Sequence, residues 1–426
     1  MGNQNTEVFV QIAGKDVLAG RIWSRYRRGT ESATFTYDES YLSRGPDAYA
    51  IDPALPLVTG QQQTPLDKKT FGAFSDCAPD RWGRRLITRA EKQQAQKRGI
   101  AERSFSEMDY VLGVRDDLRQ GALRFRDPIA RLFLAQENIG IPYLIELPKL
   151  LNAAERLERD EATENELRDL LRAGSSLGGA RPKAHVLDAS GKVAIAKFPS
   201  VKNDDWDVMR WEAVALELAR AAGICVPDFK LHSIDNKSVL ILDRFDRAQG
   251  LRIGYVSAMT MLEATDRDKE QRSYMEIAET ITLHSPQASQ DLRELWRRIA
   301  FSVLISNTDD HLRNHGFLRA SSAGWSLSPA FDLNPNPMPG PRLCTAIDLY
   351  DTSLSIDTLI EVTEEFRLSD DDVRQILSEV SSAVNSWRTV AEKLGLDRPA
   401  IEDMAPAFEH DRTERAREVI DTGVVR

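Results

Sequence analysis

The sequence predicts an α+β fold, in which a β-rich N-terminal part precedes a mainly helical C-terminal part. Short runs of β-forming residues, bounded by turn residues, fill the chain to about residue 60 and recur between residues 193 and 242. From Met259 onwards, apolar residues recur at helical spacing in long charged segments. The 426 residues suffice for two or three domains, each with its own core.

The composition is typical of a water-soluble globular protein, with 42% hydrophobic and 29% charged residues. No run of 18 apolar residues is present to form a membrane-spanning helix, and the N-terminus lacks the pattern of a secretory signal. The three cysteines are scattered and indicate neither a metal site nor a disulfide framework. We therefore expect a cytoplasmic protein without membrane contact. The net charge of −10 argues against broad non-specific binding of nucleic acid.

The N-terminal part begins with strands expected at residues 7–12, 17–20 and 33–37, which are rich in β-branched and aromatic residues. A helix follows, and its start is either Asp76 or the pair Pro79-Asp80. The basic segment 92–103 is expected to be a solvated helix face rather than a nucleic-acid site.

A long helix is expected at residues 148–171, because apolar residues recur there at helical spacing and Pro148 suits a first helical position. The small-residue loop at 174–186 follows. Its glycines would let backbone N–H groups approach an anion closely, although no Gly-Lys-Ser/Thr closes it as in a Walker A loop. A plain connector is the alternative interpretation.

The next strand is expected at residues 193–199, after a hairpin turn at 188–191. Its period of two places Val193, Ile195 and Lys197 on one face. A lysine on the same face as two β-branched core residues is unusual unless its ammonium group has a binding partner. The alternative is an edge-strand lysine whose ammonium reaches water.

The remaining elements alternate in type. A helix is expected at 207–222, with Asp207 at its start and Gly223 as its stop, before strands at 229–234 and 238–242. Further helices are expected at residues 270–281, 288–306, 353–366, 370–383 and 386–394. Residues 334–341 are expected to be irregular, and residues 410–426 to be a polar tail or frayed helix.

The most informative stretch is residues 305–317, where polar residues follow an apolar run. Asp309 and Asn314 are five apart, the separation of base and metal ligand in the kinase loop D-x-x-x-x-N, and Asp332 stands where a kinase keeps its second metal-binding aspartate. Phosphoryl transfer needs a carboxylate that positions the acceptor hydroxyl and Mg²⁺ held on the phosphate oxygens. By itself the spacing is common, and aspartate and asparagine also cap helices and form turns.

The order of the other parts supports this interpretation. A kinase has a glycine loop, a strand lysine of the V-A-I-K type, and a helix glutamate that holds the lysine. Lys197 ends Val193-Ala194-Ile195-Ala196-Lys197, and Glu212 is the candidate glutamate, with Glu217 as its rival. A solvent-facing glutamate is the alternative for either residue.

In this order of motifs the sequence resembles the HipA family of bacterial serine/threonine protein kinases, the toxins of HipBA-type toxin–antitoxin systems. The resemblance covers about residues 7–385 and includes a similarity to the family's N-terminal β-subdomain at 74–86 and 112–125. The specific matches are residues 176–183, 196–199, 244–247, 307–314 and 328–332. It implies a bilobal protein-kinase-like fold, with the extra β-subdomain at 1–140, a small lobe at 141–248 and a helical large lobe at 249–426.

The resemblance also implies roles for single residues, with ATP and Mg²⁺ as cofactors. Asp309 would be the catalytic base, and Asn314 and Asp332 the Mg²⁺ ligands. The implied ATP contacts are Gly178, Gly179, Ala180, Arg181, Pro182, Lys183, Lys197, Asp243, Arg244, Phe245, His311, Asn314 and Asp332. Ser176 would be the autophosphorylation site, with Ser175 as the alternative. A phosphate there would repel the nucleotide phosphates.

The resemblance implies three kinds of partner. These are a HipB-like helix-turn-helix antitoxin, operator DNA contacted indirectly through that antitoxin, and a protein substrate such as an aminoacyl-tRNA synthetase or another translation factor. Two alternatives stay open. The order D-x-H-x-x-N also resembles phosphoinositide-type lipid kinases, so a lipid or small molecule is another candidate acceptor. A degenerate, non-catalytic corepressor is the second alternative.

Overall fold

The computed structural model describes residues 4–27, 30–135, 140–174, 181–266, 268, 270–340 and 342–422. The chain divides into two compact units. Unit 1 comprises residues 1–204, 232–256 and 318–322, and unit 2 comprises residues 205–231, 257–317 and 323–426. Most strands belong to unit 1 and most long helices to unit 2, so the predicted α+β class is confirmed.

Unit 1 begins with a five-stranded antiparallel sheet in the order β4-β3-β2-β1-β5. Its strands are β1 (Gln4–Ile12), β2 (Lys15–Arg27), β3 (Thr30–Tyr37), β4 (Gln62–Gln63) and β5 (Leu123–Arg126). The three predicted N-terminal strands are confirmed, and each is longer than predicted. Alternate residues of β3 are buried, and Phe35 packs against the aromatic rings of Tyr37 and Phe74.

A helix in unit 1, α3 (Arg81–Arg98), begins at one of the two predicted starts. The Asp80 carboxylate accepts a hydrogen bond of 2.8 Å from the Gly83 backbone N–H, so Asp80 caps the helix. Asp76 instead ends the short helix α2 (Gly72–Ser75). Gly99, in the left-handed conformation, stops α3.

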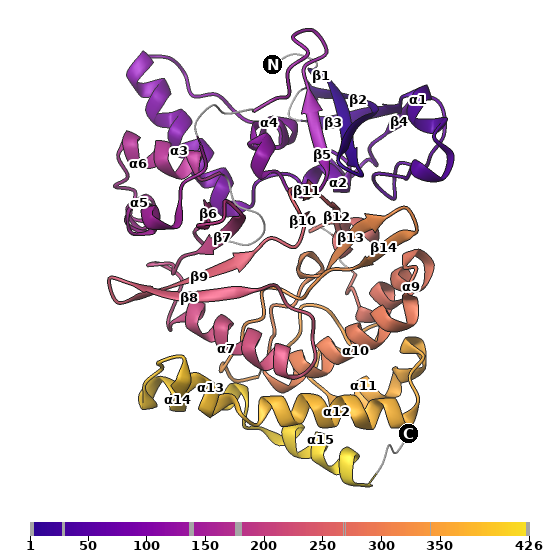
Figure 1. Cartoon of the computed structure of the whole chain (residues 1–426), viewed down its shortest axis with the longest axis vertical. Coiled ribbons are helices and arrows are strands. Elements are labelled where there is room, and N and C mark those ends of the chain that lie inside the picture. The colour runs from indigo at the N-terminus through magenta and orange to yellow at the C-terminus, as the bar shows by residue number, and fades with distance from the viewer. Residues whose placement is uncertain are drawn as a thin grey trace. The chain divides into compact units, whose positions relative to one another are not determined.

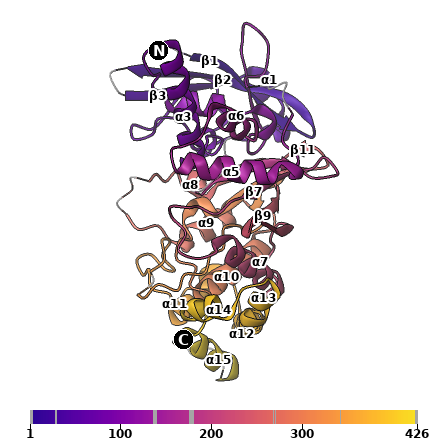
Figure 2. The ribbon, with the colours of Figure 1, turned by 90° about the vertical axis from the view of Figure 1, so that its left-hand side faces the viewer.

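The second sheet of unit 1 contains the antiparallel strands β6 (Lys183–Leu187), β7 (Val193–Lys197) and β9 (Lys237–Asp243). Two helices, α5 (Leu147–Glu158) and α6 (Glu164–Arg172), lie beside each other, and α6 also packs on α3 (Figure 2). Apolar side chains from these helices and strands form one buried core.

The single helix predicted at 148–171 is wrong, because the chain forms α5 and α6 with a break between them. Asp160 has a φ of 62°, which a helix cannot accommodate. Thr163 then starts α6 through a capping box, in which its side chain accepts from the Glu166 N–H and the Glu166 carboxylate accepts from the Thr163 N–H. Apolar residues recur at helical spacing on both sides of the break, so the sequence pattern alone does not reveal it.

Unit 2 is built around α10 (Ala288–Leu304), whose residues from Leu295 onwards are all buried. α12 (Asp370–Val384) packs against both α10 and α15 (Asp411–Thr422), and the three helices lie side by side in Figure 1. Another helix, α7 (Val208–Ala221), packs on α12 and is capped by Asp207 as predicted. The ring of Trp387 stacks on Phe408 at 4.5 Å and lies 6.2 Å from the ring of Trp211 in α7.

The other elements complete the chain. The helices are α1 (Glu39–Leu42), α4 (Glu107–Gly113), α8 (Ala258–Met261), α9 (Tyr274–His284), α11 (Ile356–Glu361), α13 (Trp387–Lys393) and α14 (Arg398–Met404). The strands are β8 (Phe229–Ile234), β10 (Arg247–Ala248), β11 (Leu251–Arg252), β12 (Gly254–Ser257), β13 (Gly316–Ser321) and β14 (Gly324–Leu327). In the part of the chain that the structure describes, no helix is long and apolar enough to cross a membrane.

Candidate active site

The predicted catalytic loop leaves the C-terminal end of α10. The helix ends at Leu304, two residues before the predicted end, because Ser306 has a φ of 53°. The Ser306 hydroxyl donates to the Ala407 carbonyl at 2.9 Å and accepts from the Arg412 guanidinium at 2.7 Å. These contacts fix the strained turn that aims the following residues.

Asp309 and Asn314 lie next to each other in this loop. The side-chain NH₂ of Asn314 donates to the Asp309 carbonyl at 3.0 Å, and the His311 N–H donates to the same oxygen at 3.0 Å. The amide oxygen of Asn314 is therefore the atom that this side chain can offer to a cation. Asn314 is buried, whereas Asp309 is exposed and open to a reactant.

The next carboxylate, Asp310, is buried and holds the loop. It accepts a hydrogen bond from the Tyr274 hydroxyl at 2.6 Å, and the His315 Nε2 lies 3.0 Å from its other oxygen. Burial alone would raise the pKa of Asp310, but the charge of His315 and the hydrogen bonds from His315 and Tyr274 bring it below its usual range. Burial and the Asp310 charge raise the pKa of Tyr274 well above its ordinary value. The two neighbouring aspartates therefore differ in role: Asp309 is exposed to solvent, and Asp310 holds the loop in place through its buried contacts.

Asp332 is tied to the same loop through asparagines. The Asn334 backbone N–H donates to the Asn307 side-chain oxygen at 3.2 Å, and the Asn334 side chain donates to Asp332 at 3.5 Å. The Asn336 side chain donates to the Thr308 hydroxyl at 2.8 Å. Asp332 has a φ of 62°, a left-handed conformation that is rare for residues other than glycine and is enriched at functional sites.

These residues fit a Mg²⁺–phosphate group. No cluster of three or more His, Cys, Asp or Glu that could hold a metal by itself occurs among the described residues. Mg²⁺ instead suits one or two protein oxygens together with phosphate oxygens, and Asn314 and Asp332 could supply the protein ligands. The His311 Nδ1 is buried and has no hydrogen-bond partner within the described chain, so it is free to contact a bound polar group.

In unit 1, Lys197 is buried at the end of β7, directly opposite Lys183 of β6 and Leu240 of β9. Because β7 lies between β6 and β9, the alternative of an edge-strand lysine is wrong. The prediction that Val193 and Ile195 are core residues is also wrong. Both are only partly buried, and Ala194 and Ala196 on the opposite face pack in the hydrophobic core. The lysine therefore shares a face with side chains that the core leaves partly open.

Two residues of the segment 178–183, which the family resemblance implies covers the ATP phosphates, make ion pairs within unit 1. The Lys183 ammonium lies 3.3 Å from the Asp80 carboxylate, and the Arg181 guanidinium donates to Asp204 at 2.8 Å. The Pro182 carbonyl accepts a hydrogen bond from the Phe198 N–H. The remaining predicted residues of the loop, Ser175, Ser176, Gly178, Gly179 and Ala180, lie outside the described residues.

The segment 243–245, which the family resemblance implies contacts the adenine of ATP, is held in place by its side chains. Asp243 pairs with the Lys192 ammonium at 2.5 Å. Arg244 is buried, binds both oxygens of Asp246, and donates to the Leu118 carbonyl at 2.7 Å. The Phe245 ring lies 6.2 Å from that of Tyr255. The Arg244 side chain therefore has a structural role, so any contact of this residue with adenine would come from its backbone.

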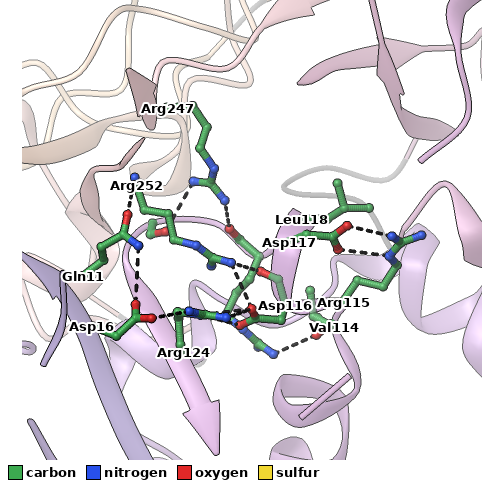
Figure 3. A network of polar contacts seen from close by, with 12 residues as sticks. Gln11, Asp16, Val114, Arg115, Asp116, Asp117, Leu118, Arg124, Arg247 and Arg252 are labelled. Carbon is green, nitrogen blue, oxygen red and sulfur yellow. Dashed lines mark hydrogen bonds and ion pairs between the residues drawn. The ribbon is translucent and has the colours of Figure 1, made fainter. Parts of the chain in front are cut away.

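A wider polar network joins this segment to the N-terminal sheet (Figure 3). The buried carboxylate of Asp116 accepts from Arg124 on β5 at 2.5 Å and from Arg252 at 3.2 Å, and Arg124 also pairs with Asp16. Arg247 donates to the Arg119 carbonyl at 2.5 Å. The stretches 112–125 and 244–247, which separately resembled the family, therefore contact each other.

The two candidate helix glutamates differ in burial. Glu212 is buried in α7, whereas Glu217 is only partly buried. A buried carboxylate is costly unless it is paired, so Glu212 is the better candidate for a functional ion pair.

The sequence matches two family models along most of its length. Residues 175–387 match the HipA-like C-terminal domain, and residues 10–109 match the HipA N-terminal domain. The structure is similar over 98% of this chain, and 100% of the other chain, to a solved structure of the Shewanella oneidensis MR-1 toxin–antitoxin complex of HipA, HipB and operator DNA. The TM-score is 0.65 at 15% sequence identity, which confirms the predicted kinase-like fold.

Two curated relatives match over shorter stretches. Y4dM of Sinorhizobium fredii, named as a candidate kinase, is 28% identical over 159 residues, covering 34% of this chain and 38% of the relative. A candidate kinase of Haemophilus influenzae is 27% identical over 134 residues, covering 28% of this chain and 39% of the relative. The chain thus spans less than half the length of these relatives.

Proposed function

The chain belongs to the HipA family, and from this premise we propose that it is a toxin-type protein kinase that transfers the γ-phosphate of ATP to a serine or threonine hydroxyl. The observation that carries the proposal is the catalytic loop. An exposed Asp309 adjoins Asn314, and the buried Asp310 beneath them holds the loop in place.

The proposed mechanism assigns one task to each residue. Asp309 accepts the proton of the acceptor hydroxyl as that oxygen forms its bond to the γ-phosphorus and ADP leaves. Asn314 and Asp332 would hold Mg²⁺, which would supply positive charge to the phosphate oxygens. Lys197 contacts the ATP phosphates, and Glu212 is the candidate for the helix glutamate of a kinase.

The proposed partners follow from the family and from the Shewanella complex. We infer that a HipB-like helix-turn-helix antitoxin binds this chain in the cytoplasm and contacts operator DNA. The proposed substrate is a translation component, and the proposed autophosphorylation site is Ser176 or Ser175. The acidity of the chain supports indirect rather than direct contact with DNA.

Incubation with Mg-ATP, followed by intact-mass measurement and phosphosite mapping, tests the proposal. We expect phosphate on Ser176 or Ser175 in the wild type, and a rate lower by about 10²–10⁴-fold in Asp309→Ala, because the general base is lost. Asp371→Ala is the matched control, since Asp371 lies on the exposed surface of α12 and pairs only with Arg374 among the described residues.

The other outcomes favour the alternatives. ATP binding without any phosphorylation of the protein would contradict self-phosphorylation and favour a lipid or small-molecule acceptor. The absence of ATP binding in the wild type would contradict a kinase and favour a non-catalytic corepressor.

A further inference from the structure

The segment Cys344–Ala346 lies against the catalytic loop and is held from both sides. The Cys344 N–H donates to the Thr308 carbonyl at 3.0 Å, and the Thr345 hydroxyl donates to the Asp310 carbonyl at 2.7 Å. On the other side, the Gln271 side chain donates to the Cys344 carbonyl at 2.8 Å. Ala346 makes a parallel β-bridge with Ser273 at the start of α9. The backbone of Cys344 is therefore fixed relative to the loop.

The side chain of Cys344 reaches the predicted base. Its Sγ lies 3.7 Å from Asp309 Oδ1, a distance at which a thiol S–H donates to a carboxylate oxygen. Within the described residues, this thiol is the one side-chain donor that contacts the Asp309 carboxylate. Asp310, by contrast, is held by the side chains of Tyr274 and His315.

We propose that Cys344 is a positioning residue for phosphoryl transfer, whose S–H holds Asp309 Oδ1 and leaves Oδ2 to accept the proton of the acceptor hydroxyl. The inference rests on the proposed function. An exposed carboxylate samples several rotamers, and one fixed oxygen reduces that freedom without covering the other.

The state of the thiol supports a donor role over a reactive one. Burial and the neighbouring Asp309 charge raise the pKa of Cys344 to about 11. The sulfur therefore stays protonated near neutral pH, and its low thiolate content makes it a poor nucleophile.

The first test compares autophosphorylation of Cys344→Ala and Cys344→Ser with the wild type. For Cys344→Ala we expect a rate constant at saturating Mg-ATP about tenfold lower, as for loss of one hydrogen bond to a charged group, and a half-saturating ATP concentration changed by less than about twofold. Cys344→Ser keeps a donor and should recover the rate to within about threefold of the wild type.

Cys225→Ala is the matched control, because Cys225 is also an exposed cysteine of unit 2, and within the described part of the chain its side chain has no hydrogen bond to the catalytic loop. Its rate should equal that of the wild type. Equal losses in the serine and alanine variants, or a loss confined to ATP affinity, would overturn the positioning role.

The second test does not depend on kinase activity. Iodoacetamide alkylation of Cys344, followed by mass spectrometry at about pH 8, should be several-fold faster in Asp309→Asn than in the wild type, because loss of the neighbouring negative charge lowers the thiol pKa. Cys225 in the same samples is the internal reference and should not respond.

The two tests separate the two proposals. Equal alkylation rates of Cys344 in both proteins would overturn the Cys344–Asp309 contact, whatever the activity. A clear rise in alkylation, with no phosphoryl transfer by the wild type, would overturn the proposed function and the positioning role that rests on it.

Discussion

Asp309 and Asp310 are neighbours in sequence, yet the protein gives them opposite environments. The Asp309 carboxylate is exposed and, among the described residues, accepts one hydrogen bond, from a thiol, whereas the Asp310 carboxylate is buried and has several partners. Two carboxylates in different environments can hold different tasks, one chemical and one structural. The loop geometry depends on Asp310 remaining ionised.

Asp310→Asn should lower the free energy of unfolding by roughly 1.5–3 kcal/mol near pH 7, since hydrogen bonds to a charged group are weakened. Tyr274, His315 and His311 face this carboxyl group. Because folding lowers the pKa of Asp310, its contribution is present above the unfolded pKa of about 3.9 and is lost as pH falls through the lower folded pKa. The difference between the wild type and Asp310→Asn should therefore shrink in acid.

Urea unfolding at neutral and acidic pH measures this difference. Asp371→Asn is the control, because its side chain is 86% exposed and should change the free energy of unfolding by less than about 0.5 kcal/mol. An undiminished difference at strongly acidic pH would show that the Asp310 charge does not stabilise the loop.

At the scale of elements, Gly20 shows how tightly β2 and β3 pair. It lies opposite Tyr37, and a Cβ at this position would sit 2.2 Å from the Thr36 carbonyl oxygen and 2.6 Å from the Phe35 ring. The first atom belongs to the backbone of β3 and the second to the buried ring of Phe35, so a shift of either atom would disturb the packed structure. The close approach of the two strands requires a residue without a side chain.

Gly20→Ala should therefore lower the free energy of unfolding by about 1–3 kcal/mol or more through overpacking. Gly113→Ala is the matched control, because Gly113 lies in open space at the end of α4 and has no positive φ. Chemical denaturation of both variants, followed by circular dichroism, gives the comparison. Equal stability of the two variants would show that β2 and β3 adjust without strain.

The helices and strands show which features of the fold can be predicted from the sequence. Local patterns predicted the strand β7 and the cap at Asp207 correctly, and offered Asp80 as one of two starts for α3, because each signal lies within a few residues of the feature. The predicted loop at 174–186 was wrong at its end, because β6 begins at Lys183 and pairs with β7. The break before α6 was missed because it depends on one left-handed residue inside a continuing helical pattern. The predictions also omitted α14, although Asp397 caps it and Pro399 follows.

The candidate site divides in the same way. The pair Asp309 and Asn314 was predictable because their spacing along the chain places them in one loop. The contacts of Cys344 with Asp309 and of Arg252 with Asp116 join residues 35 and 136 positions apart. No periodicity links such distant residues, so only the folded chain reveals them. Asn334 lay in a segment predicted to be irregular, where its side chain gave no signal.

For the whole molecule, the net charge of −10 predicts weak binding of the chain itself to DNA. The chain alone should bind duplex DNA no more tightly than the non-specific range of about 10⁻⁴–10⁻⁶ M at physiological salt. Addition of the proposed antitoxin should tighten binding to operator DNA. Fluorescence anisotropy of a labelled operator duplex, with and without antitoxin, measures both, and a scrambled duplex is the control. Tight operator binding by the chain alone would contradict indirect contact.

The interleaving of the two units along the chain affects how the protein is made. The five-stranded sheet is complete at Arg126, so it can form early on the ribosome. The apolar face of α7 emerges about 150 residues before its partner α12. At a translation rate of about 5–20 residues per second, α12 is synthesised roughly 7–30 s after α7, and the apolar face of α7 lacks this partner during that time. The turn before the catalytic loop waits as well, because Ser306 contacts Ala407 and Arg412, which follow it by 101 and 106 positions, so the loop cannot take its final geometry until those later residues have been made.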